Sequence, residues 1–381
     1  MRGGEDMPTL ADALDRLTAP GTLVEGLPDG DVRCVACGHR CLIRPGRRGT
    51  CRVRFNRDGE LRVPWGYVAG LQSDPTEKKP FYHLLPGSDT LTFGMLGCDF
   101  HCGYCQNWLS SQALRDPASD GSVGYIRTIT PEAMVHDGLR LGAQVIASSY
   151  NEPLITIEWA VEIFRLAKAA GLRCAFVSNG NATPEALRAL SPYLTAYKVD
   201  LKTMQDRNYR QLGGVLGHVL DTIRAAHALG LWVEVVTLVV PGFNDSTDEL
   251  MDAARFLAGV SPDIPWHVTA FHPDYRMTDP DPTTAETLIR AAEIGQEAGL
   301  KFVYAGNLPG RAGTYEHTVC PGCGKRLIER LGFAVLSYSL TDDGACPGCG
   351  QRIPGVWDST AGNVRTTDPG GLSLRRPRVV R

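Results

Sequence analysis

The chain has 381 residues, of which 43% are hydrophobic and 21% charged, and its formal net charge is −3. These values are ordinary for a soluble globular protein, and the charge argues against a protein that binds polyanions with its whole surface. Because no run of about 18 apolar residues occurs and the first ten residues lack an apolar signal core, we expect a cytoplasmic protein without a membrane span.

Cysteine is the most informative residue type in this sequence. Eleven of the 12 cysteines fall into three groups, and only Cys174 stands alone. Gaps of two or three residues are too short for ordinary disulfide bonds but are typical of thiolates that share a metal, which indicates a reducing compartment. Cys174 lies in an apolar run, so we expect an inert buried thiol there.

The first group belongs to a short N-terminal module, for which we expect the bounds 1–70. Its cysteines are Cys34, Cys37, Cys41 and Cys51. Four thiolates suit zinc, which is our first interpretation. An auxiliary iron–sulfur cluster is the alternative, because the number of thiolates does not separate the two metals. His39 could replace one of the four ligands.

Seven arginines surround these cysteines, and no acidic residue lies between Cys34 and Arg54. One interpretation is a patch that binds phosphate or RNA. The other is that the basic side chains offset the net charge of about −2 on a four-thiolate zinc site. We favour the second, because Phe55 is the only aromatic residue close by that could stack on bases.

Strand-like and helix-like segments alternate from 71 to 310, where we expect the central domain. Thr130, Thr183 and Ser246 stand at helix N-cap positions, and a glycine follows each of several helical stretches. This alternation implies parallel crossovers, and therefore an α/β fold with a barrel or an open parallel sheet, whose functional residues gather at the C-terminal strand ends. The expected strands cover residues 91–96, 144–149, 173–177, 196–201, 232–240, 266–271 and 301–305.

The loop after the first of these strands contains Cys98, Cys102 and Cys105 with C-x3-C-x2-C spacing. Three thiolates can bind three corners of a [4Fe–4S] cubane and leave the fourth iron open. S-adenosylmethionine (SAM) can chelate such an iron through its amino and carboxylate groups, and Tyr104 is well placed to cover the adenine. The alternative is a structural zinc site completed by a distant ligand, but such sites usually have paired cysteines and four protein ligands.

This loop resembles the signature of the radical SAM superfamily, a C-x3-C-x-aromatic-C motif after the first strand of a partial (β/α)6 barrel. Further motifs within residues 31–357 are similar to those of the AmmeMemoRadiSam-system radical SAM enzymes, which are related to the pyruvate formate-lyase activating enzymes. These motifs are EKKPFYH at 77–83, QNW at 106–108, YNEP at 150–153, PGFND at 241–245 and FHPDYR at 271–276.

The resemblance implies an enzyme that cleaves SAM reductively at a [4Fe–4S] cluster, generates a 5′-deoxyadenosyl radical and abstracts hydrogen from an unidentified substrate. It also implies AMMECR-type and Memo-type protein partners and an electron donor such as a flavodoxin or a ferredoxin. The residues that act on the substrate are unknown, because fold alone does not set substrate identity.

Residues at the later strand ends are candidates for contacts to SAM. Glu152 resembles the acid that accepts the SAM ammonium, with a helix-capping role as the alternative, and Asn179 resembles a SAM contact, with a plain turn as the alternative. Asp200 and Lys202 lie two residues apart and share one face, and the alternative is a structural ion pair. His272 could meet SAM or substrate, or be structural.

The third group forms a C-terminal module, for which we expect the bounds 311–357. Two C-x2-C pairs separated by 22 residues predict a zinc ribbon, with an iron–sulfur cluster as the alternative. After this module the composition changes to Gly, Pro, Thr and Arg without periodicity, so we expect 358–381 to be a disordered tail. The ribbon cysteines are Cys320, Cys323, Cys346 and Cys349.

Two other functions are compatible with the sequence. The first is an activase that installs a glycyl radical on a partner protein, although the known activases of that group often carry ferredoxin-like inserts. The second is an RNA-binding or RNA-modifying protein that uses the two outer cysteine modules to hold the nucleic acid.

Overall fold

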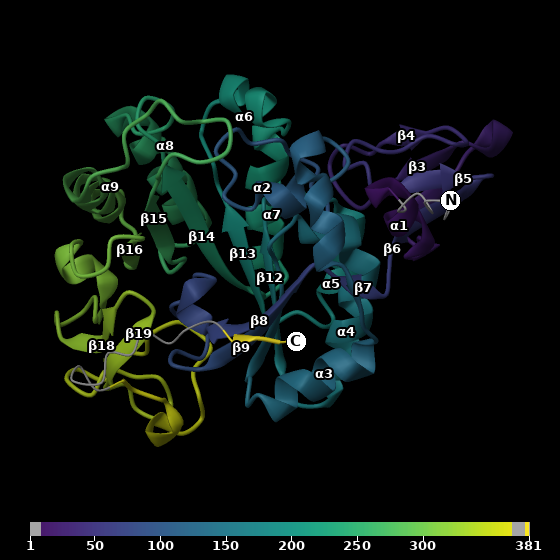
Figure 1. The fold of residues 1–381 in the computed structure, drawn as a ribbon. Helices are drawn as coiled ribbons and strands as arrows, with labels where there is room; N and C mark the ends of the chain where they lie inside the picture. The colour runs from purple at the N-terminus through teal and green to yellow at the C-terminus, as the bar shows by residue number, and fades with distance from the viewer. Residues whose placement is uncertain (1–8, 368–377, 381) are drawn as a thin grey trace, which may run out of the picture.

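The computed structural model describes residues 9–367 and 378–380 of the chain. At its centre is a nine-stranded sheet in the order β16-β15-β14-β13-β12-β11-β9-β8-β20 (Figure 1). The strands from β16 to β9 in this order are parallel, whereas β8 is antiparallel to β9 and β20 to β8. β16 and β20 form two separate edges, so the curved sheet does not close into a full barrel (Figure 1). The strands are β8 (Gly70–Pro75), β9 (Asp89–Gly94), β11 (Val145–Ser148), β12 (Arg173–Ser178), β13 (Ala196–Asp200), β14 (Trp232–Val239), β15 (Trp266–Ala270), β16 (Val303–Gly306) and β20 (Arg378–Val379).

The seven strands expected from the sequence correspond to the seven parallel strands, with ends that agree within two residues. Every residue of β9, β11 and β15 is buried. Strands covered on both faces are rich in apolar residues, so a mostly apolar run was a useful signal, although β9 also buries Asp89, Thr90 and Thr92. The expected α/β fold is therefore confirmed.

Helices follow the parallel strands and cover the outer face of the curved sheet (Figure 1). The hydroxyl groups of Thr130, Thr183 and Ser246 accept backbone N–H groups in the first turns of α3, α5 and α8, at 3.2, 3.1 and 3.3 Å, as their sequence positions predict. The helices of this domain are η2 (Thr76–Lys78), α2 (Trp108–Ser111), η3 (Pro117–Tyr125), α3 (Pro131–Arg140), η4 (Pro153–Thr156), α4 (Ile157–Ala169), α5 (Pro184–Leu190), α6 (Asp206–Leu212), α7 (Leu216–Ala228), α8 (Thr247–Val260) and α9 (Ala285–Glu297).

The N-terminal module consists of short strands and packs on the barrel through residues distant in sequence. The backbone N–H of Gly38 donates to Asn181 O at 2.8 Å, and Arg40 donates to Glu185 at 2.6 Å. Its elements are α1 (Leu10–Arg16), β1 (Thr18–Pro20), β2 (Val24–Gly26), η1 (Pro28–Gly30), β3 (Val32–Cys34), β4 (Leu42–Ile43), β5 (Phe55–Arg57), β6 (Glu60–Pro64) and β7 (Tyr67–Val68), the last paired with β10 (Arg127–Thr128).

A buried ion pair also connects the N-terminal module to the barrel. Arg54 is 1% exposed, and its two terminal nitrogens donate to the two carboxylate oxygens of Glu158 in α4, each at 2.7 Å. Arg54 also donates to Ile155 O at 3.1 Å. Burial would raise the pKa of Glu158, but the adjacent guanidinium outweighs it, so that pKa is lowered. Each charge therefore depends on its partner.

The C-terminal module is fixed to the segment between β8 and β9. Arg330 is 1% exposed and donates to Tyr82 O and to the Thr318 hydroxyl, both at 2.8 Å, and its guanidinium lies 4.2 Å from the centroid of the Tyr82 ring. The module is therefore part of the same packed body as the barrel. Its elements are η5 (Gly313–Glu316), β17 (Thr318–Val319), β18 (Arg326–Leu331) and β19 (Ala334–Tyr338), followed by η6 (Ala361–Asn363).

The expectation of a disordered tail over 358–381 is wrong for the part of the tail that the structure describes. Residues 361–363 form η6, and β20 pairs with β8. The reason is that β8 would otherwise be a free edge of the sheet, with unpaired backbone groups that accept another strand. Residues 368–377 and 381 lie outside the described residues, so the prediction stays untested there.

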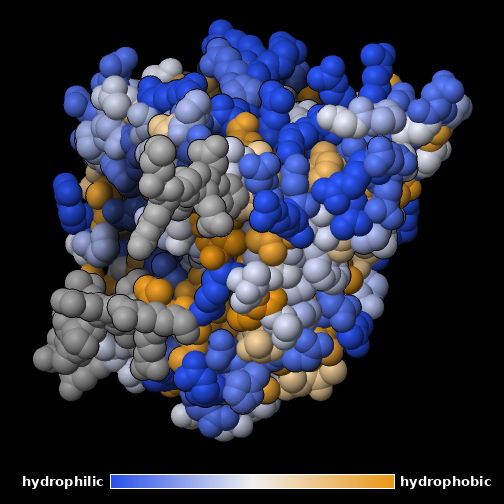
Figure 2. Space-filling model, turned by 45° about the vertical axis from the view of Figure 1, so that its right-hand side comes forward, coloured by the Kyte–Doolittle hydropathy of each residue, from blue (hydrophilic) through white to orange (hydrophobic). Residues whose placement is uncertain are grey.

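The surface is mostly hydrophilic on the face shown in Figure 2, and hydrophobic residues gather around the middle of that face. None of the helices in the described part of the chain combines the length and the apolarity that a bilayer crossing requires.

Candidate active site

A cavity of about 440 Å³ opens at the C-terminal ends of the parallel strands and extends into the partial barrel. Its walls come from the cysteine loop after β9, from the ends of β11, β12 and β13, from β14 and β15, and from residues 77–80 and 82. Residues 305–309 and 332–333 also line it, so the C-terminal module contributes to the wall. This volume suits a small molecule.

Cys98, Cys102 and Cys105 all line this cavity. The backbone N–H of Phe100 contacts Cys98 Sγ at 3.3 Å, and the Ser111 hydroxyl lies 3.1 Å from Cys105 Sγ. Burial raises the pKa of Cys102 to about 12 and also raises the pKa values of the other two thiols. Buried thiolates require a nearby cation, and a metal centre shared by the three would provide it.

Gly97 gives the loop its shape. Its φ is +97°, and a side-chain carbon there would lie 2.9 Å from both methyl groups of Val53 in the N-terminal module. The left-handed backbone and the lack of space both require glycine. The loop is also held by Arg115, which donates to Cys98 O at 3.1 Å and to Thr50 O of the N-terminal module at 2.8 Å.

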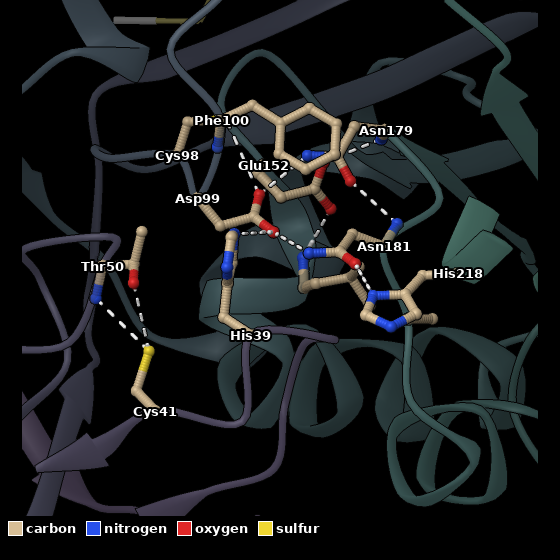
Figure 3. Close-up of polar contacts among 12 residues, drawn as sticks. His39, Cys41, Thr50, Cys98, Asp99, Phe100, Glu152, Asn179, Asn181 and His218 are labelled. Carbon is tan, nitrogen blue, oxygen red and sulfur yellow. Dashed lines mark hydrogen bonds and ion pairs between the residues drawn. The ribbon is translucent and has the colours of Figure 1, made fainter. Parts of the chain in front are cut away.

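Asp99 is the centre of a buried polar network beside the cysteine loop (Figure 3). Its carboxylate accepts the side-chain amides of Asn179 at 2.7 Å and Asn181 at 2.8 Å, and His39 Nε2 lies 3.8 Å away. His218 Nδ1 is hydrogen-bonded to Asn181 Oδ1 at 3.0 Å. The network therefore joins the cysteine loop, the end of β12 and the N-terminal module.

Comparison with known proteins identifies the family. A family model described as the Radical SAM superfamily matches residues 93–257. A protein of Methanocaldococcus jannaschii named "Uncharacterized protein MJ0808" is 39% identical over 311 residues, which are 81% of this chain and 90% of that protein. The chain belongs to the radical SAM superfamily. This membership confirms the prediction from the cysteine loop.

Two activating enzymes are more distant relatives of this radical SAM protein. The isethionate sulfite-lyase activating enzyme of Oleidesulfovibrio alaskensis is 24% identical over 186 residues, 47% of this chain and 59% of that protein. The pyruvate formate-lyase-activating enzyme of Staphylococcus aureus is also 24% identical over 186 residues, 46% of this chain and 72% of that protein. Members of the superfamily are enzymes, so this chain is an enzyme, and its radical SAM domain implies a [4Fe–4S] cluster and SAM.

Glu152 lines the cavity of this radical SAM enzyme and is 2% exposed. Its Oε1 accepts Leu154 N–H at 3.0 Å and the Ser178 hydroxyl at 2.7 Å, and its Oε2 accepts Asn179 N–H at 2.8 Å. Burial, together with the nearby charge of Asp99, raises the pKa of Glu152 to about 8. The carboxylate caps η4, and Oε2 keeps capacity for one more donor.

Asp200 and Lys202 also line the cavity, and the structure adds Lys198 to them. Asp200 accepts hydrogen bonds from Lys198 and, at 3.4 Å, from Lys202. Burial would raise the pKa of Asp200, but the two ammonium groups outweigh it and lower that pKa. The ion pair considered as a structural alternative is therefore present, and it faces the cavity.

The remaining predicted residues differ in position. Asn179 and Tyr104 line the cavity, and the Tyr104 hydroxyl is buried without a hydrogen-bond partner in the described structure. His272 is not among the lining residues. Its side chain is 57% exposed, and its Nδ1 is hydrogen-bonded to the side chain of Gln106 at 3.0 Å. The structure thus brings Asn179 and Tyr104 to the cavity and leaves His272 outside it.

The C-terminal cysteines form a compact group that could hold a metal ion. The sulfur atoms of all four lie within 4.8 Å of one another, and the Cys320–Cys349 and Cys323–Cys346 pairs are each 3.6 Å apart. The N-terminal cysteines, within the described residues, form no such compact group. Cys34, Cys37 and Cys51 are buried, and Cys41 is half-buried.

The arginines of the N-terminal module are largely paired with acidic residues of the protein itself. Besides Arg54 and Arg40, Arg48 contacts Asp15 at 2.7 Å and Arg33 contacts Glu25 at 3.5 Å. Four of the seven arginines are thus occupied by ion pairs, which leaves fewer of them to bind a polyanion.

Proposed function

We propose that Cys98, Cys102 and Cys105 bind the [4Fe–4S] cluster, and that the cavity beside them holds SAM and a small substrate from which hydrogen is abstracted. The observation that carries this proposal is that three thiols, one buried and two half-buried, face one cavity lined by acidic, basic and amide side chains. The three thiols fit a cubane with one open iron. When bound, the cluster and SAM supply reductive cleavage of the sulfonium to methionine and a 5′-deoxyadenosyl radical.

The direct test is anaerobic. Reconstituted wild-type protein with a strong reductant should convert SAM into 5′-deoxyadenosine and methionine. Protein that carries its full iron content but forms neither product would refute the proposed reaction.

The residues around the cavity have separate roles in this proposal. Glu152 accepts the ammonium of SAM through the free capacity of Oε2, and Asn179, Asp200 and Lys202 orient the rest of the cofactor. Tyr104 covers the adenine. Asp99 positions Asn179 and holds the cysteine loop. These assignments are supported by the position of the side chains at the cavity or next to it.

Replacing Glu152 with glutamine should weaken SAM binding roughly tenfold, because one charged hydrogen bond of about 1.5 kcal/mol is lost. Iron content should persist. Glu249→Gln is the matched control, since Glu249 is buried and accepts Met204 N–H at 2.9 Å but does not line the cavity. Equilibrium binding of SAM to both variants measures the effect. Equal SAM affinities of the two variants would contradict the proposed contact between Glu152 and SAM.

We further propose zinc in the C-terminal module and a separate metal in the N-terminal one, zinc being the first interpretation there and an iron–sulfur cluster the alternative. The Cys320→Ser/Cys323→Ser variant should lose about one equivalent of zinc and keep its iron. In the matched Cys34→Ser/Cys37→Ser variant, the metal that is lost identifies the N-terminal site. Elemental analysis of soluble protein gives both results, and iron loss with unchanged zinc in the first variant would contradict the ribbon.

We also propose that this enzyme belongs to the AmmeMemoRadiSam-system group and works with AMMECR-type and Memo-type partners. The five sequence motifs quoted above support the group. The names of the two distant relatives state that they activate isethionate sulfite-lyase and pyruvate formate-lyase, which are proteins. Co-purification of tagged enzyme with its partners from cells is the corresponding experiment.

A further inference from the structure

Two sets of charged side chains, each with two lysines and one aspartate, contribute lysines to the cavity wall. In the first, Asp200 pairs with Lys198 and Lys202. In the second, Asp74 accepts Lys78 at 3.2 Å and Lys79 at 2.7 Å. All four lysines line the cavity. Two ammonium groups against one carboxylate leave each set with an excess of one positive charge.

Two of these lysines have hydrogen-bond donors left over. The side chains of Lys79 and Lys198 are only 4% and 6% exposed. An ammonium group carries three N–H donors, yet in the described structure each of the two has a single acceptor, a carboxylate. Lys79 also lies 5.4 Å from the centroid of the Tyr150 ring. Buried donors without acceptors are costly, so an acceptor within the cavity would stabilise them.

The other acidic residues at this end of the cavity are turned toward partners of their own. Glu316 accepts the backbone N–H groups of Gly310 and Gly332. Glu77 accepts Gly87 N–H at 2.9 Å and lies 3.9 Å from Arg330. They therefore hold backbone turns and a buried arginine, and the lysine ammonium groups remain available to a ligand.

We propose that the substrate is a small anion with a carboxylate or phosphate group, and that Lys79 and Lys198 bind this group. The inference rests on the proposed function, because it names the substrate class of the same cavity. Lys198 precedes Asp200 in β13, so it lies deeper in the barrel than the strand-end residues assigned to SAM. Lys79 comes from the segment that follows β8, away from the cysteine loop.

The test measures anion binding without any turnover. Metal-loaded full-length protein is titrated by calorimetry under anaerobic conditions with inorganic phosphate and, separately, with succinate. The wild-type protein should bind at least one of the two, and the preferred anion identifies the group. Lys79→Met and Lys198→Met should each weaken binding about tenfold, since each removes a charged hydrogen bond.

Control variants test whether a loss of anion binding comes from the lysines of the cavity. Lys301→Met removes an exposed lysine that pairs with Asp263 at 2.8 Å outside the cavity, and it should bind the anion like wild type. Lys79→Arg keeps the charge and should retain most of the affinity. If Lys79→Met does not fold, Lys78→Met, from the same charge set, replaces it, with a smaller expected loss because Lys78 is 30% exposed.

Two outcomes overturn the inference: neither anion binds the wild-type protein, or binding is unchanged in both lysine variants. Formation of 5′-deoxyadenosine is measured separately. Wild-type protein that cleaves SAM but binds neither anion refutes the substrate class alone. Protein that binds an anion through Lys79 and Lys198 but never cleaves SAM refutes the proposed reaction and leaves the anion site in place.

Discussion

Replacing any one of Cys98, Cys102 and Cys105 with alanine is expected to reduce the formation of 5′-deoxyadenosine from SAM to background. Three protein thiolates hold three irons of the proposed cluster, so the loss of one corner prevents a stable cubane. The three thiols line one cavity, and no fourth cysteine lines it within the described structure. The measurement is anaerobic product analysis together with iron content, and both should fall in all three variants.

Cys174 provides the matched control for this result. It is also a buried thiol, but it lies in β12, and its Sγ contacts Phe164 O at 3.6 Å on the side away from the cavity lining. Cys174→Ala should therefore retain both iron and SAM cleavage. Formation of 5′-deoxyadenosine in a variant that lacks all three loop cysteines would refute the cluster assignment.

Arg54→Met is expected to have the largest effect on stability, a decrease of about 3–5 kcal/mol in the free energy of unfolding. The substitution leaves the Glu158 carboxylate buried without its cation, and it removes two hydrogen bonds of 2.7 Å. Chemical denaturation followed by circular dichroism, on metal-loaded protein, measures the loss.

The exposed Arg165–Glu162 pair is a suitable comparison, because its N–O distance is also 2.7 Å. Arg165→Met should change the unfolding free energy far less than Arg54→Met does, since water screens such a pair. Adding Glu158→Leu to Arg54→Met should recover part of the loss. Similar losses for the two single arginine variants would contradict the role assigned to burial.

The barrel could be predicted from the sequence because its signals are local. An apolar run such as 266–271 and an N-cap such as Thr183 depend on neighbouring residues only. The antiparallel edge was not predicted, since β8 contains Gln72, Ser73 and Asp74 and lacks the apolar character of a central strand. Its pairing with β20 joins residues about 300 positions apart, and a local sequence pattern cannot predict such a contact.

The candidate site was predictable where the spacing of residues alone indicates metal binding, as in the loop of Cys98, Cys102 and Cys105. Asp99 and Asn181 were missed, because their roles depend on burial and on partners distant in sequence. Lys198 was missed although its partner Asp200 lies two residues further along the same strand. Asp99 directly follows Cys98, and Asn181 stands two residues after Asn179. Lys198 stands two residues before Asp200, so the spacing that placed Asp200 and Lys202 on one face could also have included it.

The contacts of the N-terminal module have a consequence for folding during synthesis. Its hydrogen-bond partners on the barrel lie far along the chain: Arg54 and Glu158 are 104 residues apart, and Arg40 and Glu185 are 145 apart. This module leaves the ribosome before its partners on the barrel, yet it cannot dock until more than a hundred further residues have been translated. The N-terminal cysteines therefore remain undocked until α4 and α5 have formed, so a segment that is translated early is among the last to reach its final packing.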